Sequence, residues 1–245
     1  EGHTFSPLMV TLLLRRRGWD VLYLGADVPT NRLQATIERT QPNLVVFSAH
    51  LLDTAASLLD VATYLREIDL SLGYSGYIFG VLPELSRRIP GHFLGFDLRQ
   101  TPQLIENIIL NRPPVPPVEP IPAAYQQAWT YFRERSGLIE AHMWQSHESV
   151  AGISGVAEAN RRLTSNILAA LKLGDLDFIG PNLRWLEGMM VNHNLPPAVL
   201  CNFLKTYHSA AALHLDAPAG EPVVSWLARV AAECEAATAQ LADHY

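Results

Sequence analysis

A carboxylate and an imidazole lie two residues apart at the start of the sequence, in Glu1-Gly2-His3. Histidine is a common metal ligand, and an acidic neighbour that accepts its other ring N–H fixes the tautomer and raises the basicity of the ligating nitrogen. The pair comes directly before a helical pattern, and the short apolar segment after that helix ends in Gly-Ala-Asp27. The spacing predicts that His3 is a metal ligand; the alternative is an ordinary loop histidine.

Three further residues lie at the carboxyl ends of predicted strands: Ser48, His50 and Gly80. Ligands of α/β sheets bind outside the carboxyl ends of the strands, so these residues are candidates for ligand contact. A glycine there lets a ligand pass close to the backbone. The alternatives are that Ser48 is a turn residue at a strand end and that His50 caps the next helix.

The C-terminal half is rich in aromatic and histidine side chains. The candidates for cofactor contact are His142, Trp144, His147, Tyr207 and His208. A flat apolar cofactor that carries carboxylates needs an apolar slot and a few cations at its mouth. Arg161 and Arg162 meet that need, because they lie on a segment otherwise dominated by Ile, Leu and Ala. The alternative for the two arginines is a solvated helix face.

Residues 4–111 alternate between helical and strand patterns, which predicts a doubly wound α/β sheet. The predicted helices are Leu8–Arg17, Asn31–Arg39, Leu52–Ile68, Glu84–Arg88 and Pro102–Asn111, and the predicted strands are Val21–Gly25, Leu44–Ser48, Tyr77–Gly80 and His92–Gly95. The apolar Leu44–Ser48 strand should be covered on both faces. Since the ligand loop of such a sheet follows an interior strand, we expect a further strand before Glu1 in a longer natural chain.

A proline-rich linker, residues 112–122, separates this first domain (1–111) from a second one (123–245). The second domain has no convincing strand. The predicted helices are Ala123–Met143, Ser149–Leu173, Leu176–Asn192, Pro197–Leu215 and Val223–Tyr245. Five helices with short joints predict an all-α, globin-like or bundle domain.

The bulk composition excludes several classes of protein. A formal net charge of -6 argues against direct contact with nucleic acid, and no apolar segment reaches the ~20 residues that span a membrane. Cys201 and Cys234 lie in apolar helical patterns and are interpreted as small buried hydrophobic residues, without a disulfide. We therefore expect a cytoplasmic location.

The first domain resembles vitamin B12-binding domains of the flavodoxin-like (Rossmann-like) class. Their acid-x-His-x-x-Gly motif matches Glu1 and His3, with Ser6 in place of the glycine, and residues 22–29 are similar to the light-responsive B12 repressors. The resemblance implies that His3 displaces the vitamin's own base and ligates cobalt from below. It also implies that Ser48 lies in the tunnel for the nucleotide tail. Only Gly80 remains of a further Gly-Gly motif.

A B12 domain followed by a helical domain resembles the photocobilins, photoreceptors that bind adenosylcobalamin and the linear tetrapyrrole biliverdin. This resemblance implies a homo-oligomeric light sensor rather than an enzyme, although it could regulate an effector enzyme. No cysteine is placed for a thioether bond, so we expect non-covalent biliverdin with its propionates on Arg161, Arg162 or both. His142 or His147, around Trp144, would face the upper side of the cobalt.

Two other functions stay open at this point. A corrinoid carrier could shuttle methyl groups, although the helical cap of such carriers normally precedes the B12 domain. Alternatively, a B12 domain could be fused to a haem-binding, globin-like sensor that uses His193, His208 or His214. An absorption spectrum separates these functions, because corrin, bilin and haem absorb at different wavelengths.

Overall fold

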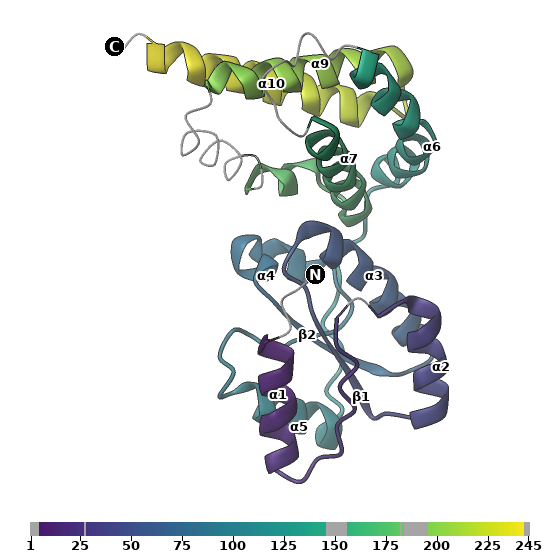
Figure 1. Cartoon of the computed structure of the whole chain (residues 1–245). Helices are drawn as coiled ribbons and strands as arrows, with labels where there is room; N and C mark the ends of the chain where they lie inside the picture. Colours follow the sequence, from purple (N-terminus) through teal and green to yellow (C-terminus); the bar gives the residue numbers. More distant parts are fainter. Residues whose placement is uncertain (1–4, 27, 146–155, 182, 184–195, 243–245) are drawn as a thin grey trace. The chain divides into compact units, whose positions relative to one another are not determined.

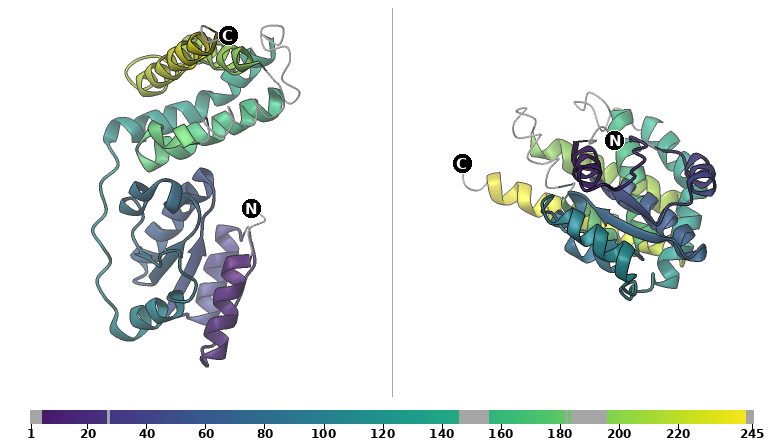
Figure 2. Two further views of the ribbon diagram at one scale, coloured as in Figure 1. Left: turned by 90° about the vertical axis from the view of Figure 1, so that its left-hand side faces the viewer. Right: turned by 90° about the horizontal axis from the view of Figure 1, so that it is seen from below.

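The structure is a computed structural model, and it describes residues 5–26, 28–145, 156–181, 183 and 196–242. Five candidate residues lie outside these residues: Glu1, His3, Asp27, His147 and, for the haem alternative, His193. The chain forms two compact units, with the boundary between Pro120 and Ile121. Each unit is described by itself, in the views of Figures 1 and 2.

The first unit contains a small parallel sheet with helices between its strands (Figure 1). Its elements are α1 Phe5–Arg16, α2 Thr30–Thr40, β1 Leu44–Ser48, α3 Leu52–Glu67, β2 Ser71–Ser75, α4 Ile78–Val81, the 3-10 helix η1 Pro83–Arg87, β3 His92–Phe93 and α5 Thr101–Asn111. The strand order is β1-β2-β3, and both pairs are parallel. This architecture fits the flavodoxin-like class, in which helices connect parallel strands.

The first helix shows how local sequence builds the core of this unit. Its apolar stripe buries Val10 and Leu14 against Ile105 and Ile108 of α5. The helix ends because Gly18 adopts a left-handed conformation, φ +86°, in which its N–H still reaches the carbonyl of Arg15 at 3.0 Å. Glycine adopts this conformation without the steric cost that a Cβ atom brings.

The predicted strand Tyr77–Gly80 is wrong, and the second strand lies earlier, at Ser71–Ser75. Residues 77–80 instead enter the short helix α4, where the Gly80 N–H donates to the carbonyl of Tyr77 at 2.9 Å. The sequence of β2 looks polar, yet it is the central strand. A Cβ atom on Gly73 would lie 3.0 Å from Leu94, so glycine there makes room for that leucine.

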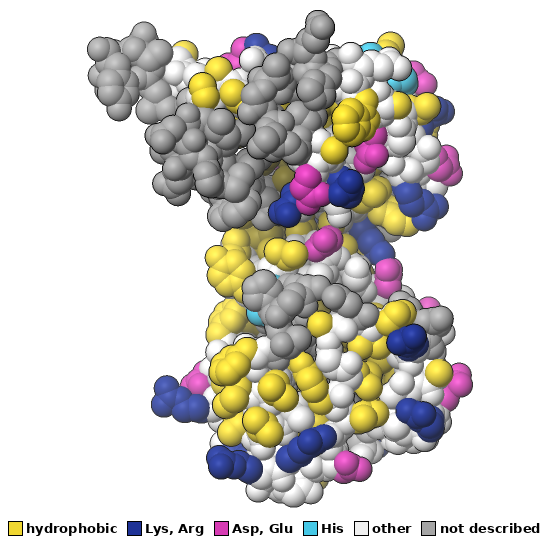
Figure 3. Space-filling model, viewed as in Figure 1, with side chains coloured by type: hydrophobic (Ala, Val, Ile, Leu, Met, Phe, Trp, Pro, Cys, Tyr) yellow, Lys and Arg dark blue, Asp and Glu magenta, His cyan; other side chains and the backbone are white. Residues whose placement is uncertain are grey.

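The predicted strand Val21–Gly25 is also absent from the described part of the chain. A strand needs a neighbour for its backbone groups, and the carbonyl of Val21 instead accepts from the Arg15 guanidinium at 2.7 Å. Among the described residues, β1 pairs only with β2, and Val46 in the middle of β1 is 40% exposed. The expectation that this strand is covered on both faces is therefore wrong. Figure 3 shows apolar side chains gathered on the viewed surface of the first unit.

All the regular elements that the structure describes in the second unit are helices. Its elements are α6 Ala123–Gln145, α7 Val156–Leu173, the 3-10 helix η3 Leu176–Ile179, α9 Pro197–His214 and α10 Glu221–Ala242. Helix α6 packs against α7 and α9, and α9 packs along α10. The predicted helix Leu176–Asn192 begins as the 3-10 helix, and most of its remainder lies outside the described residues. The helical class fits the prediction, whereas the globin-like topology stays a prediction.

The interpretation of Cys201 and Cys234 as unlinked residues is wrong, because the structure joins them in a disulfide between α9 and α10. The two helices run antiparallel after a short connection, which brings the start of α9 beside the end of α10. The Cα atoms of the two cysteines are 5.5 Å apart, a distance that a disulfide can bridge. Two cysteines 33 residues apart give no sign of this pairing until the helices are placed.

Among the described helices, none is both long enough and apolar enough to cross a membrane.

Candidate functional site at the carboxyl edge of the sheet

Two serines end neighbouring strands at the carboxyl edge of the sheet. Ser48 of β1 and Ser75 of β2 are register partners, and the N–H of Ala49 donates to the carbonyl of Ser75 at 2.9 Å. Both serines are half-buried. Because the carboxyl ends of parallel strands are where α/β sheets bind ligands, this edge presents two hydroxyl groups to an incoming molecule.

A histidine adds a third polar group at the same place. Nε2 of His50 lies 3.0 Å from the hydroxyl oxygen of Ser48. His50 does not cap α3 as one interpretation had it: the N-cap residue is Leu51, whose N–H donates to the Thr54 hydroxyl at 3.1 Å. The contact with Ser48 therefore fixes one ring nitrogen of His50 at the strand end, with donor and acceptor roles that depend on the tautomer.

The glycine that brings backbones together here is Gly76 rather than Gly80. Gly76 has φ +130°, and a Cβ atom on it would lie 1.9 Å from the carbonyl oxygen of Ala49. A larger residue would therefore push the ends of β1 and β2 apart. Gly80 lies on α4, and a Cβ atom there would meet the Phe96 ring at 3.4 Å, an ordinary contact. Both glycines are present in the sequence. Gly80 was predicted to contact the ligand because the second strand was predicted at Tyr77–Gly80, whereas it lies at Ser71–Ser75.

An aromatic cluster packs at and just after the ends of β2 and β3. Tyr74, Phe79, Phe93 and Phe96 form a chain of ring contacts with centroid distances from 4.9 to 5.8 Å. The chain runs from Tyr74, which is 1% exposed, to Phe96, which is 61% exposed. Burial raises the pKa of Tyr74 to about 12, and its hydroxyl donates to the carbonyl of Ser86 at 3.0 Å.

Large exposed apolar side chains follow each strand. Leu51 comes shortly after β1, Tyr77 after β2 and Phe96 after β3, and they are 50%, 68% and 61% exposed. Apolar side chains gathered around polar groups are typical of a ligand-binding edge. Sequence reasoning missed all three residues, although the chain positions directly after the strands were the available signal.

Residues 1–98 match the model of the B12 binding domain family. The match covers the described sheet and its carboxyl edge, and it supports a cobalamin-type cofactor for this unit. Among curated proteins, none matches the chain. The residues of the edge suit such a cofactor, because hydroxyl and imidazole groups can bond a polar nucleotide tail while Leu51, Tyr77 and Phe96 offer apolar contact to a macrocycle.

The expected cobalt ligand, His3, and its neighbours Glu1 and Asp27 lie outside the described residues. Within the described ranges, no group of three or more His, Cys, Asp or Glu side chains could hold a metal ion. Cobalt ligation by His3 stays a prediction.

The candidate residues of the helical unit that the structure describes have different surroundings. The rings of His142 and His214 meet edge to face with centroids 5.7 Å apart, and Trp144 is 56% exposed near the end of α6. Tyr207 is fully buried, and its hydroxyl oxygen lies 2.8 Å from that of Thr164. Burial raises the pKa of Tyr207, so this phenol is a neutral member of the core. His208, its neighbour on α9, is half-buried.

The two candidate anchoring arginines share one carboxylate. Arg161 Nη1 and Arg162 Nε lie 2.6 and 2.7 Å from the two oxygens of Glu158, and both arginine side chains are largely exposed. The hydrogen bond from Arg162 is the main reason that the pKa of Glu158 lies below its usual range. This arrangement is what the solvated-face interpretation expects, and a propionate would have to compete with Glu158 for the same donors.

Proposed function

We propose that the chain is a light sensor that binds adenosylcobalamin in its first unit and biliverdin, non-covalently, in its helical unit. The observation that carries the cobalamin part is the match of residues 1–98 to the B12 binding domain family. The edge of the sheet supports it, since Ser48, His50 and Ser75 place polar groups where the nucleotide tail would lie.

The residues of the chain have distinct roles in this proposal. His3 would be the lower axial ligand, and Glu1 would accept its other ring N–H and keep the ligating nitrogen basic. Ser48 and His50 would bond the tail, and the aromatic cluster behind them would hold the strand ends rigid. When bound, adenosylcobalamin supplies a cobalt–carbon bond that light can break.

The sensor role rests on the similarity of residues 22–29 to light-responsive B12 proteins and on the helical unit that follows. Loss of a group from the upper side of a cofactor lets a nearby side chain move, which can bias packing between units or subunits. We propose that the side chains that move are those of His142, Trp144 and His147. We expect a homo-oligomer whose assembly changes with light, and an output carried by a partner or an effector enzyme.

Absorption spectra of the purified full chain test the proposal. We expect corrin bands that change on illumination after adenosylcobalamin is added in the dark, and a red band after biliverdin is added. Size-exclusion profiles taken in the dark and after illumination should differ. Corrin bands with no light response would favour the methyl carrier, and a Soret band after haem addition would favour the haem sensor.

A His3→Ala variant tests the axial ligand. Cobalamin binding should weaken, or the bound spectrum should become that of a form without imidazole. An unchanged affinity together with an unchanged spectrum would rule out ligation by His3. For the bilin, extraction into acidic solvent should remove all the pigment from the chain, and pigment that stays attached would contradict the non-covalent proposal.

A further inference from the structure

A cavity in the helical unit lies against the disulfide. Its volume is about 390 Å³, and its walls come from η3, α9 and α10. Leu204, Trp226 and Val230 give it an apolar lining, whereas Asp177, Arg229 and Glu233 supply charged groups. Cys234 belongs to the same lining, one helical turn beyond Val230. The disulfide is therefore part of the cavity wall and is not sealed inside the packed core.

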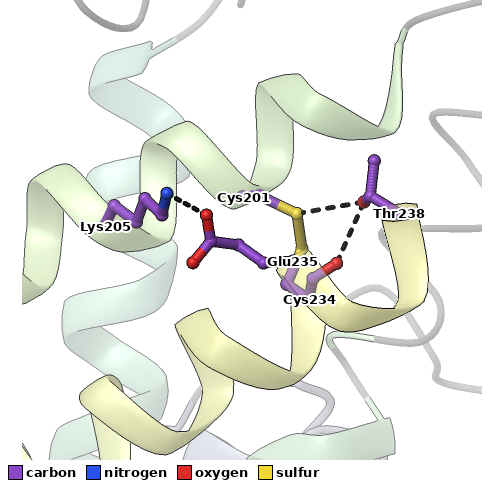
Figure 4. The surroundings of a disulfide bond; sticks show 5 residues. All are labelled: Cys201, Lys205, Cys234, Glu235 and Thr238. Atoms are coloured by element: carbon purple, nitrogen blue, oxygen red, sulfur yellow. Dashed lines mark hydrogen bonds and ion pairs between the residues drawn. A yellow bond between two sulfur atoms is a disulfide. The ribbon is translucent and has the colours of Figure 1, made fainter. Parts of the chain in front are cut away.

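We propose that the Cys201–Cys234 pair is a redox site that dithiols reach through this cavity, and that its reduction opens the cavity by releasing α9 from α10. The proposal is independent of light sensing. It rests on the unequal surroundings of the two sulfur atoms and on the contacts that join the two helices at this point (Figure 4).

The two sulfur atoms differ in access. Cys201 is 4% exposed, whereas Cys234 is half-buried and lines the cavity. Thiol–disulfide exchange depends on access of the attacking thiolate and on which sulfur it reaches. The geometry favours attack at Sγ of Cys234, with Cys201 as the leaving group.

Thr238 can accept a hydrogen bond from the thiol of Cys201 after reduction. Its hydroxyl donates to the carbonyl of Cys234 at 2.9 Å, and its oxygen lies 3.3 Å from Sγ of Cys201 (Figure 4). A hydroxyl has a single hydrogen, and a disulfide sulfur has none to donate. Once Cys201 is a thiol, its S–H can donate to the lone pair of Thr238 that faces it. Reduction therefore replaces the covalent link between the two helices by a weak S–H hydrogen bond.

The exchange is balanced by the dithiol itself. A thiolate of the dithiol attacks Sγ of Cys234, the S–S bond breaks, and its electron pair leaves with Sγ of Cys201. The second thiol group of the dithiol then attacks its own sulfur in the mixed disulfide and releases Cys234 as a thiolate. The dithiol ends as a disulfide, and the two cysteine thiolates take up protons from the dithiol thiols through solvent.

At this end of the two helices, Leu200 and Leu204 of α9 and Val230 of α10 line the cavity beside the disulfide. The ion pair between Lys205 and Glu235 lies beside it, but each side chain is about half exposed (Figure 4). Exposed ion pairs contribute little to stability because solvent screens them. Separation of the start of α9 from the end of α10 would widen the cavity and expose the indole of Trp226.

Thiol labelling of the full chain tests the site. Protein kept under air should show no free thiol when denatured, and native protein treated with dithiothreitol should show two. In single variants, Cys234 in Cys201→Ser should react with a thiol reagent roughly tenfold faster than Cys201 in Cys234→Ser. Two free thiols in the air-kept protein, or equal labelling rates, would overturn the proposal.

Fluorescence quenching by acrylamide tests the opening. Dithiothreitol should increase the quenching of the intact chain. The chain has four other tryptophans, so the Trp226→Phe variant is needed to assign this increase to Trp226. The variant should not show the increase. The double variant Cys201→Ser, Cys234→Ser should show the increased quenching with or without the dithiol. Equal quenching of the oxidised and reduced intact protein would overturn the opening, and this readout needs no variant that could misfold.

Discussion

The hydroxyl oxygen of Ser48 lies 3.0 Å from Nε2 of His50 at the carboxyl end of β1. This contact holds the imidazole over the strand end, beside the register partner Ser75. It joins a serine and a histidine two residues apart, on an otherwise apolar segment, into one polar group. A change at Ser48 therefore alters two side chains of the proposed cofactor site.

Ser48→Ala should therefore weaken cobalamin binding. The variant loses one hydroxyl and the partner that orients His50, and a net hydrogen bond contributes about 0.5–1.5 kcal/mol, which corresponds to up to roughly tenfold in affinity. Titration of the full chain with cobalamin, followed by absorption, measures the change. Ser57→Ala is the matched control, because that exposed serine on α3 bonds only the carbonyl of Asp53 in its own helix. Equal affinities for the two variants would contradict the role of Ser48.

Sequence patterns located the elements whose apolar residues recur regularly. Leu44–Ser48 was predicted with its observed bounds, and the helix at residues 52–67 was predicted with one extra residue. The strand Ser71–Ser75 was missed because its glycine and serines do not look like strand residues. Its burial comes from its central position between β1 and β3, which the local sequence does not reveal.

The site was predictable to a similar extent. Ser48 and His50 were predicted because they lie at the carboxyl end of a recognisable strand, and their contact with a cofactor stays a prediction. Gly76 was not identified, since its role depends on how closely the ends of β1 and β2 approach. The Cys201–Cys234 disulfide was not predictable either, because it depends on the antiparallel placement of α9 and α10. Contacts between residues distant in sequence are in each case the missing information.

The buried pair Tyr207–Thr164 should contribute to stability through its hydrogen bond. Tyr207→Phe and Thr164→Val each leave a buried hydroxyl without its partner, which costs about 1–3 kcal/mol. The double variant removes both groups and should be less destabilised than the sum of the two single changes, with a coupling of about 1 kcal/mol. Urea unfolding of the full chain, followed by circular dichroism, measures the cycle. Strict additivity would show that the 2.8 Å contact carries no net energy.

Tyr74 should make the first unit sensitive to alkaline pH. Burial raises its pKa to about 12, whereas an unfolded tyrosine titrates near 10. Above pH 10 the unfolded chain loses this proton while the folded chain keeps it, so stability falls as the pH rises towards 12. The contribution is complete below pH 10 and amounts to at most about 2.7 kcal/mol.

The unfolding free energies at about pH 9 and at about pH 11 test this dependence. Tyr74→Phe should show a smaller decrease between the two pH values, because the titrating phenol is gone while the ring contacts with Phe79 and Phe93 are kept. Tyr64→Phe is the control, because Tyr64 is a half-buried tyrosine of α3. This variant should keep the full decrease in unfolding free energy between the two pH values. An unaltered decrease in Tyr74→Phe would contradict the prediction.

Glu158 should act as a competitor for the bilin if Arg161 and Arg162 anchor its propionates. Both arginines now bond this one carboxylate. Glu158→Gln removes the charge and should tighten biliverdin binding roughly two- to fivefold, the range expected when exposed ion pairs of this kind no longer need to be broken. Arg161→Ala with Arg162→Ala should instead weaken binding by about tenfold or more, since each arginine–carboxylate bond contributes about 1.5–3 kcal/mol.

Titration of the dark protein with biliverdin, followed at the red absorption band, measures these affinities. Glu134→Gln is the control, because it removes an exposed carboxylate from α6 without touching either arginine. Opposite changes in Glu158→Gln and in the double arginine variant are expected only if the propionates and Glu158 use the same donors. If both variants bind biliverdin as the unmodified chain does, the arginines form a solvated helix face and the anchoring role is excluded.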